Sequence, residues 1–309
     1  MKVWVTGGAG FLGSHLVESL IARGDDVTVI DDFSTGDIAN LGATAASVDL
    51  RRMNLLDDAL AGELASARPD VIYHLAGDAL VARSVADPLS DCERNLLATL
   101  RLLDAVRRVS PESKLLFAST GAVYGDNAVK PFTENDTLAP ISPYAVAKLA
   151  SERYCFAYAR TYGLRTCSLR LFSVYGPRQR KQVVFDLIRK LHASEDEIEV
   201  YGDGTQERDF SHSANIVDAF QLAAARAPFQ GEAINVAGDQ IVTIRALVAQ
   251  LGALMGKTSR VRYTGHRRPG DSQRWIADTT VLRSMGFTPR VQLAAGLRDT
   301  IDWYVSQSK

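Results

Sequence analysis

A glycine-rich turn near the start of the sequence constrains the fold more than any other feature. The residues from Thr6 to Gly13 read TGGAGFLG and join an apolar run, Lys2–Thr6, to a segment with apolar residues at helical spacing, Phe11–Arg23. Glycines at such a junction let a strand turn tightly into a helix and let the backbone approach a pyrophosphate, which the helix N-terminus stabilises. The pattern predicts a strand, a turn and a helix that bind a dinucleotide.

Short apolar runs alternate with amphipathic segments through the first half of the chain. The expected strands are Lys2–Thr6, Asp26–Asp31, Val71–Ala76, Lys114–Ser119 and Arg165–Leu171, and the expected helices include Phe11–Arg23, Asn95–Val109 and Tyr144–Tyr162. Strict alternation implies right-handed βαβ crossovers and a parallel sheet. We therefore predict an α/β fold with a Rossmann-type, doubly wound sheet, whose ligands bind beyond the carboxyl ends of the strands.

The alternation becomes looser after about residue 170, where glycine- and proline-containing loops separate short strands and helices. This change predicts a dinucleotide-binding domain over residues 1–169 and a smaller C-terminal α/β lobe over residues 170–309. The boundary is soft, because such lobes often exchange elements with the main sheet.

Composition excludes several classes of protein. A net charge of -1 provides no global field for nucleic acid or an acidic membrane. Three cysteines without a CxxC pair argue against a disulfide framework and fit a reducing, cytoplasmic location. The five histidines lack metal-ligand spacing, so no metal is expected. We also find neither a signal-peptide pattern nor an apolar stretch long enough for a membrane span.

A carboxylate at the end of the second expected strand indicates which dinucleotide binds. Asp31 lies 18 residues after Gly13, where an acidic residue accepts hydrogen bonds from the adenosine ribose hydroxyls. The same carboxylate would repel a 2′-phosphate. We therefore expect NAD rather than NADP.

Two further motifs carry hydroxyl groups toward the same edge. Tyr144 and Lys148 lie four residues apart on an expected helix, hence on one face, where the ammonium would lower the pKa of the phenol toward neutrality. The cationic nicotinamide of NAD⁺ would act in the same direction. Ser119 and Thr120 end the expected strand Lys114–Ser119. In isolation, the first pair also fits a surface helix and the second fits local turn bonding.

Together, these motifs resemble the extended short-chain dehydrogenase/reductase family, in its NAD-dependent nucleotide-sugar epimerase/dehydratase group. GxxGxxG, the hydroxyl pair 24 residues before the tyrosine, and YxxxK occur in the order and spacing of that family. The resemblance covers nearly the whole chain. It implies bound NAD, a nucleotide-diphosphate sugar as substrate, and a homodimer formed through helices near residues 92–109 and 144–162.

The resemblance also implies three sets of site residues. The cofactor set is Gly7, Gly10, Phe11, Leu12, Gly13, Asp31, Asp32, Ser34, Thr35, Gly36, Asn54, Leu55, Leu75, Ala76, Gly77, Asn95, Tyr144 and Lys148. The catalytic set is Tyr144, Lys148, Thr120 and Ser119. The substrate set is Thr120, Tyr144, Ser173, Arg180, Tyr201, Arg208, Arg268 and Asp271. Arginines suit a diphosphate because their donors form a planar fork, although a single arginine is more often solvated.

The resemblance implies a shared first step, in which Tyr144 takes a proton from a sugar hydroxyl while hydride passes to NAD⁺. Dehydratases of the family carry acidic residues directly after the hydroxyl pair, and decarboxylases keep a glutamate at the second of these positions. Here the two positions are Gly121 and Ala122, and we expect no other local carboxylate to reach that place. We therefore favour a UDP-sugar 4-epimerase acting through a 4-keto intermediate. The alternatives are a nucleotide 4-keto-sugar reductase and a non-catalytic NAD-binding sensor.

The sugar itself stays open between a neutral UDP-hexose, UDP-glucuronate and another nucleotide sugar. Ser173 and Arg180 occupy positions similar to the Thr and Arg near the sugar carboxylate in UDP-glucuronate 4-epimerases. A bidentate arginine there would discourage loss of CO₂ from a β-keto acid. Those enzymes commonly continue with Pro-Asp, whereas this chain reads Lys181-Gln182. The basic run also fits a solvated loop or a second phosphate contact.

Overall fold

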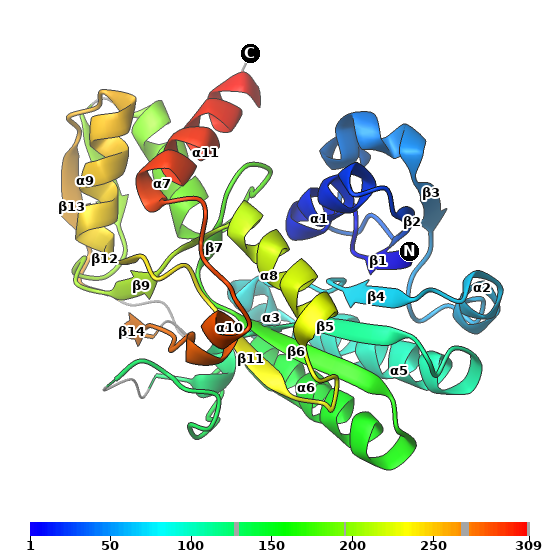
Figure 1. Cartoon of the computed structure of the whole chain (residues 1–309). Helices are drawn as coiled ribbons and strands as arrows, with labels where there is room; N and C mark the ends of the chain where they lie inside the picture. The colour runs from blue at the N-terminus through cyan, green and yellow to red at the C-terminus, as the bar shows by residue number, and fades with distance from the viewer. Residues whose placement is uncertain (127–129, 195, 267–271, 308–309) are drawn as a thin grey trace.

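A seven-stranded parallel sheet forms the centre of the computed structural model, which describes residues 1–126, 130–194, 196–266 and 272–307 (Figure 1). The strand order is β11-β6-β5-β4-β1-β2-β3, and every neighbouring pair is parallel. The strands are β1 (Lys2–Thr6), β2 (Asp26–Asp31), β3 (Asp49–Arg52), β4 (Val71–His74), β5 (Lys114–Thr120), β6 (Arg165–Leu171) and β11 (Ala233–Val236). The predicted doubly wound sheet is confirmed.

Helices cover both faces of this sheet, which is why its central strands read as continuous apolar runs. One face packs against α1 (Phe11–Ala22) and α8 (Ser213–Arg226), and both helices contribute to one buried apolar cluster. The other face packs against α2 (Leu60–Ala67), α5 (Ala98–Val109) and α6 (Pro143–Tyr162), which share a second cluster. In Figure 1, α5 and α6 run side by side beneath the strands.

Three local features differ from the sequence-based expectations. The edge strand β3 was missed, because its residues DLRR are largely exposed and form no apolar run. The strand predicted over Val71–Ala76 ends at His74, where the chain turns toward Gly77 at φ +144°. The helix predicted from Asn95 contains a π-helical turn, Glu93–Leu97, before α5 begins at Ala98. Such turns often occur at functional sites, and this one holds Asn95 in the interior.

The later half of the chain builds a smaller lobe around its own apolar cluster. Its main helices are α7 (Gln182–Ala193), α9 (Ile244–Met255) and α11 (Leu293–Gln307), which stand together apart from the central sheet in Figure 1. Its short strands are β7 (Val174–Tyr175), β8 (Glu197–Val200), β9 (Glu207–Asp209), β10 (Ser211–His212), β12 (Ile241–Thr243), β13 (Arg260–Tyr263) and β14 (Arg274–Trp275). They form one mixed and two parallel small sheets.

Short helical segments complete the connections between these elements. They are η1 (Ile38–Ser47), α3 (Val81–Ala86), α4 (Pro88–Cys92), η2 (Glu93–Leu97), η3 (Gly121–Tyr124) and α10 (Thr280–Ser284). The central sheet takes β11 from beyond residue 170, so the division into residues 1–169 and 170–309 stays a prediction.

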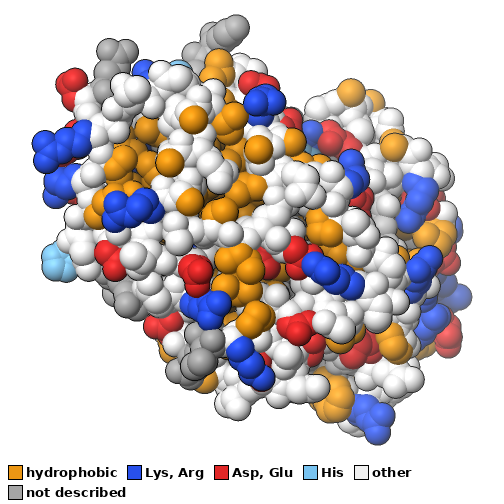
Figure 2. Space-filling view, turned by 60° about the vertical axis from the view of Figure 1, so that its left-hand side comes forward, with side chains coloured by type: hydrophobic (Ala, Val, Ile, Leu, Met, Phe, Trp, Pro, Cys, Tyr) orange, Lys and Arg blue, Asp and Glu red, His pale blue; other side chains and the backbone are white. Residues whose placement is uncertain are grey.

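Charged side chains of both signs are interspersed on the face shown in Figure 2, in keeping with the net charge of -1. Within the described ranges, every helix is too short or too polar to cross a membrane.

Candidate active site

A cavity of about 900 Å³ opens at the carboxyl edge of the central sheet and extends beneath the smaller lobe. The predicted site residues that line it are Gly7, Gly10, Phe11, Leu12, Gly13, Asp31, Asp32, Ser34, Thr35, Gly36, Asn54, Leu55, Leu75, Ala76, Gly77, Asn95, Ser119, Thr120, Tyr144, Lys148, Ser173, Arg180, Tyr201 and Arg208. Arg268 and Asp271 lie outside the described residues. The fold therefore brings together segments from both halves of the chain.

The glycine turn joins β1 to α1 with almost no space for side chains. Gly7 has φ +70°, and a Cβ at Gly13 would lie 2.0 Å from the carbonyl oxygen of Gly7. The N-cap of α1, Gly10, provides no side-chain acceptor, and the first turn contains no acidic residue. The N–H groups of this first turn lack intrahelical partners. They face a cavity that the turn itself lines, and such an arrangement holds a pyrophosphate.

Asp31 ends β2 directly beside this turn. Its Oδ2 accepts a hydrogen bond from Ala9 N at 2.9 Å and its Oδ1 accepts one from Phe33 N at 2.9 Å. Burial raises the pKa of this carboxyl group, while the two backbone donors act in the opposite direction. Each carboxylate oxygen can accept a further hydrogen bond and Asp31 lines the cavity, so the group fits ribose hydroxyls.

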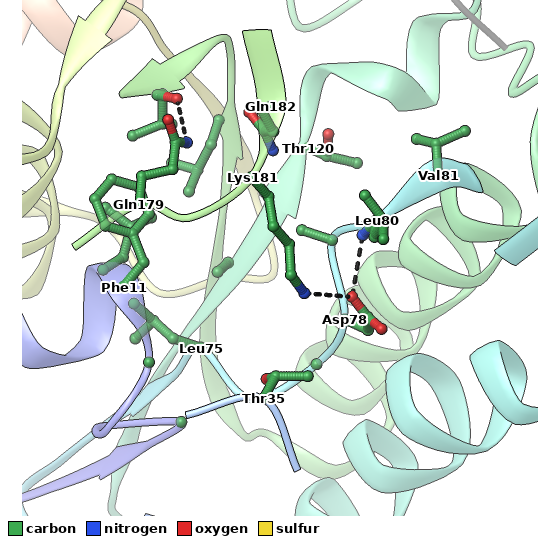
Figure 3. A pocket seen from close by; sticks show the side chains of 18 of the residues that line it. Phe11, Thr35, Leu75, Asp78, Leu80, Val81, Thr120, Gln179, Lys181 and Gln182 are labelled. Carbon is green, nitrogen blue, oxygen red and sulfur yellow. Dashed lines mark hydrogen bonds and ion pairs between the residues drawn. The ribbon is translucent and has the colours of Figure 1, made fainter. Parts of the chain in front are cut away.

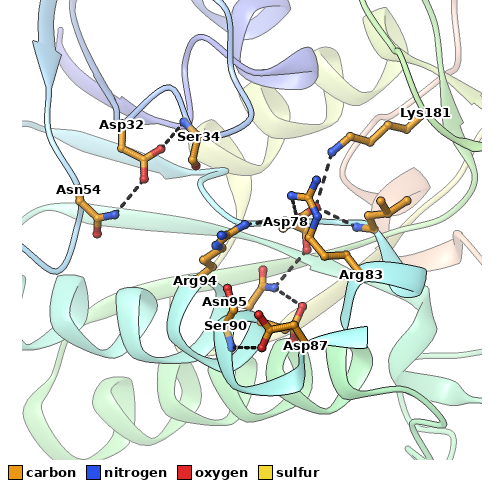
Figure 4. Close-up of polar contacts among 12 residues, drawn as sticks. Asp32, Ser34, Asn54, Asp78, Arg83, Asp87, Ser90, Arg94, Asn95 and Lys181 are labelled. Atoms are coloured by element: carbon orange, nitrogen blue, oxygen red, sulfur yellow. Dashed lines mark hydrogen bonds and ion pairs between the residues drawn. The ribbon is translucent and has the colours of Figure 1, made fainter. Parts of the chain in front are cut away.

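Asp32 connects two segments that the sequence assigned to the cofactor. Its Oδ2 accepts from Asn54 Nδ2 at 2.9 Å, and its Oδ1 accepts from Ser34 N at 2.8 Å (Figure 4). These bonds fix the turn after β2 against the segment after β3. The role of Asp32 in this geometry is to shape the cavity wall.

Tyr144 lies in the first turn of α6, which is capped by Ser142 Oγ accepting from Ala145 N at 3.2 Å. Its side chain is buried, and burial raises the pKa of Tyr144 to about 12. A hydrogen bond with the Thr120 side chain lowers this pKa, whereas the charges of Asp91 and Asp78 raise it further. The direction is opposite to the one expected from Lys148, because burial is the largest effect.

Lys148 lies one helical turn further along α6 and is buried as well. Its ammonium is 4.2 Å from the centroid of the Phe117 ring, a cation–π contact. Burial lowers the pKa of Lys148 to about 8. Burial and the Lys148 charge together lower the pKa of His74 to about 3, and that ring bonds to Thr6 Oγ1 at 2.7 Å and to Thr99 Oγ1 at 2.9 Å. His74 is thus a neutral structural residue beneath the site.

Ser119 lines the cavity, but its hydroxyl is bonded to a buried carboxylate. Its Oγ donates to Glu152 Oε2 at 2.9 Å. Glu152 also accepts from Arg170, at 2.6 Å from Nη2 to Oε1 and at 3.0 Å from Nε to Oε2. Thr120 therefore remains as the member of the pair whose hydroxyl lies beside Tyr144. The sequence order could not distinguish the two hydroxyls.

A carboxylate that the sequence reasoning did not consider lies in the same cavity. Asp78 follows the segment Leu75–Gly77 and is 4% exposed. It forms ion pairs with Arg83 at 2.6 Å, Arg94 at 3.8 Å and Lys181 at 3.7 Å (Figure 4). We expected no local carboxylate to replace the acidic residues that dehydratases carry after the hydroxyl pair, and Asp78 is a carboxylate of the same cavity that this expectation left out. Its position directly after a cofactor-lining loop was the signal that sequence reasoning missed.

The smaller lobe supplies the remaining predicted residues. Ser173 is half-buried, and the Arg180 side chain is exposed at the cavity wall. Arg208 is buried and donates from Nη1 to the carbonyl of Glu207 at 2.9 Å. Tyr201 is 45% exposed, so it is not a core residue. These residues therefore line the same cavity as the glycine turn.

The chain is similar in sequence and in structure to several known proteins. The family model described as "NAD dependent epimerase/dehydratase family" matches residues 3–237. A UDP-glucose 4-epimerase from Mycolicibacterium smegmatis is 34% identical, over 100% of both chains. A dTDP-glucose 4,6-dehydratase from Streptomyces niveus is 32% identical, over 98% of this chain and 93% of its own. The solved structure of UDP-glucuronic acid 4-epimerase from Bacillus cereus, in complex with UDP-glucuronic acid and NAD, is 30% identical with a TM-score of 0.91 over 100% of both chains.

Proposed function

Since the chain belongs to the NAD-dependent epimerase/dehydratase family, we propose that it is a nucleotide-sugar 4-epimerase. One observation carries the proposal: Thr120, Tyr144 and Lys148 meet in the cavity that also contains the glycine turn and Asp31. The fine choice among reactions rests on the two positions after Thr120. A Cβ at Gly121 would lie 2.8 Å from the Phe172 ring, so this position has no room for an acidic side chain without a shift of that ring.

The chain's own residues have distinct tasks in this reaction. The open N-terminus of α1 would hold the pyrophosphate of NAD, Asp31 the adenosine ribose and Lys148 the nicotinamide ribose. NAD, when bound, supplies the hydride acceptor and a positive charge. Tyr144 takes the proton from the C4 hydroxyl and later returns it, and Thr120 holds the same oxygen by a hydrogen bond. Positioned acid–base catalysis of this kind contributes about 10²–10⁴-fold to the rate.

Epimerisation at C4 does not require Asp78 to donate a proton to the sugar. Its Oδ2 accepts a hydrogen bond from Arg83, and its Oδ1 accepts one from Leu80 N at 3.1 Å. Both oxygens are thus engaged as hydrogen-bond acceptors within the protein. Elimination of water would need an acid that donates a proton, whereas rotation of a 4-keto sugar and return of hydride to its other face would not.

The proposal is tested by incubating the desalted protein, without added cofactor, with UDP-, dTDP-, GDP- and CDP-sugars. We expect the protein to retain NAD and to produce a 4-epimer with no net change in NADH, as followed by NMR and by absorbance at the nicotinamide band. A stoichiometric requirement for added NADH or NADPH would identify a 4-keto-sugar reductase. A 4-keto-6-deoxy product would identify a dehydratase. Either result would replace the proposal.

We also propose that two copies of the chain associate through α6 and the helical segment over residues 88–109. These helices pack against each other and carry exposed apolar side chains, namely Leu89, Leu97, Tyr154 and Phe156. An apolar surface of this kind is typical of an interface. Leu103, on the same helical segment, is fully buried in the core and does not take part.

Light scattering at micromolar concentration is expected to give the mass of a dimer. Leu97→Asp should shift the mass toward that of a monomer, because it places a charge in the apolar contact. Val281→Asp, at an exposed apolar position on α10, is the matched control and should leave the mass unchanged. A monomeric wild-type protein would contradict the prediction.

A further inference from the structure

The cluster around Asp78 uses the two carboxylate oxygens differently. Oδ2 faces the guanidinium groups of Arg83 and Arg94, which lie on α3 and on the π-helical turn Glu93–Leu97. Oδ1 faces the ammonium of Lys181, which comes from the segment between β7 and α7. Asp78 is 4% exposed, whereas each of the three cations is 41–45% exposed. The carboxylate is therefore the buried and fixed member of the cluster.

Lys181 connects two walls of the cavity. Figure 3 shows its side chain extending from the lobe segment toward Asp78, with Thr120 and Thr35 lining the same space. Asp78, Arg94 and Lys181 all line the cavity, whereas Arg83 does not. The contact of 3.7 Å between Lys181 Nζ and Asp78 Oδ1 thus brings opposite charges together inside the space that a ligand must enter.

The pair also lies within electrostatic reach of the reacting position. The charge of Asp78 raises the pKa of Tyr144, whose phenol must contact the reacting hydroxyl under the proposed function. A charge that acts on Tyr144 across the cavity also acts on a sugar bound beside Tyr144. A uronate would bring a second carboxylate into this region, where like charges repel and where Lys181 is already paired. A neutral hexose would leave the Asp78–Lys181 pair intact.

We propose that Asp78 and Lys181 discriminate between sugars by their charge and select a neutral hexose over a uronate. The proposal rests on the proposed function and specifies its substrate class. In this arrangement Asp78 masks a cation that would otherwise receive a sugar carboxylate. Specificity of this kind uses an unfavourable contact with the wrong substrate rather than a better contact with the right one.

The test compares UDP-glucose with UDP-glucuronate on the NAD-containing protein, both as kcat/KM and as affinity measured by calorimetry. Wild type should prefer UDP-glucose. Asp78→Asn should raise the glucuronate-to-glucose ratio by about tenfold or more, because it frees Lys181 from its counter-charge. Lys181→Met should lower the ratio, because it leaves the carboxylate and removes a cation. Asp58→Asn removes an exposed carboxylate paired with Arg101 and is the matched control, with no change expected.

Opposite shifts in the two variants distinguish selection from a structural role, which would move both ratios in the same direction. A wild-type preference for UDP-glucuronate, or an unchanged ratio in both variants, would overturn the proposal while leaving the 4-epimerase intact. If wild type formed no 4-epimer of any sugar, the proposed function would fail. The ratio of the calorimetric affinities for UDP-glucuronate and UDP-glucose would still show whether the pair discriminates between sugars by charge. Should Asp78→Asn not fold, Lys181→Met gives the decisive measurement, because it spares both arginine contacts.

Discussion

Tyr144→Phe is expected to reduce turnover of a nucleotide sugar by about 10²–10⁴-fold or more, while the fold and ligand binding persist. The substitution removes the oxygen that we propose as acceptor of the substrate proton and keeps the ring in its buried position. Turnover should be measured together with NAD content and with the affinity for UDP-glucose. Tyr162→Phe changes an exposed tyrosine at the end of the same helix and should leave all three quantities unchanged.

Near-normal turnover of the Tyr144→Phe protein would require another base. Loss of NAD along with activity would instead indicate that the phenol serves cofactor binding. The buried hydroxyl has the Thr120 side chain as a hydrogen-bond partner. We therefore expect the variant to leave that partner in place and to change chemistry rather than affinity.

Glu152→Ala is expected to destabilise the folded state by about 3–5 kcal/mol. The Arg170–Glu152 pair is buried, with both side chains 3% exposed. Removal of the carboxylate leaves a buried guanidinium whose remaining partners are Tyr124 Oη and the carbonyl of Glu134. Thermal unfolding should show a Tm lower by roughly 10 °C for a chain of this size.

A double substitution distinguishes the loss of the ion pair from the cost of leaving one buried charge unpaired. Glu152→Met combined with Arg170→Met removes both charges and should recover much of the stability that Glu152→Ala loses, because no unpaired charge remains. Glu152→Gln, which retains an acceptor for Ser119, should fall between wild type and Glu152→Ala. Equal stability of wild type and Glu152→Ala would show that the pair contributes little.

The central sheet was predictable because its strands obey local rules. Buried parallel strands are short apolar runs, and for β1, β2 and β6 the predicted boundaries agree with the structure. The edge strand β3 lacks such a run, since it has solvent on one side. The turn at Gly7 was predictable for a different reason: only glycine fits where φ is positive and the backbone of Leu75 and Ala76 lies this close.

The candidate site was predictable only where its residues form a motif. Tyr144, Lys148 and Thr120 have fixed spacings, whereas the contact of Asp78 with Lys181 joins segments about a hundred residues apart, beyond any local pattern. The hydroxyl of Ser119 depends on Glu152 for its direction, and sequence does not reveal that bond. The pKa of Tyr144 depends on burial in three dimensions, which outweighed the neighbouring cation.

Strand β11 is synthesised well after β6, its neighbour in the sheet, and this order affects how the chain folds on the ribosome. Strand β6 is nearly all interior and forms bonds on one side with β5 and on the other with β11, as in the bond of 2.9 Å from Ser168 N to the carbonyl of Glu232. At about 5–20 residues per second, synthesis leaves that second side of β6 without its neighbour for several seconds. A nascent chain halted before residue 233 would present a strand edge with unpaired backbone groups, which is a template for aggregation. Ribosome stalling in this interval should therefore increase demand for chaperones.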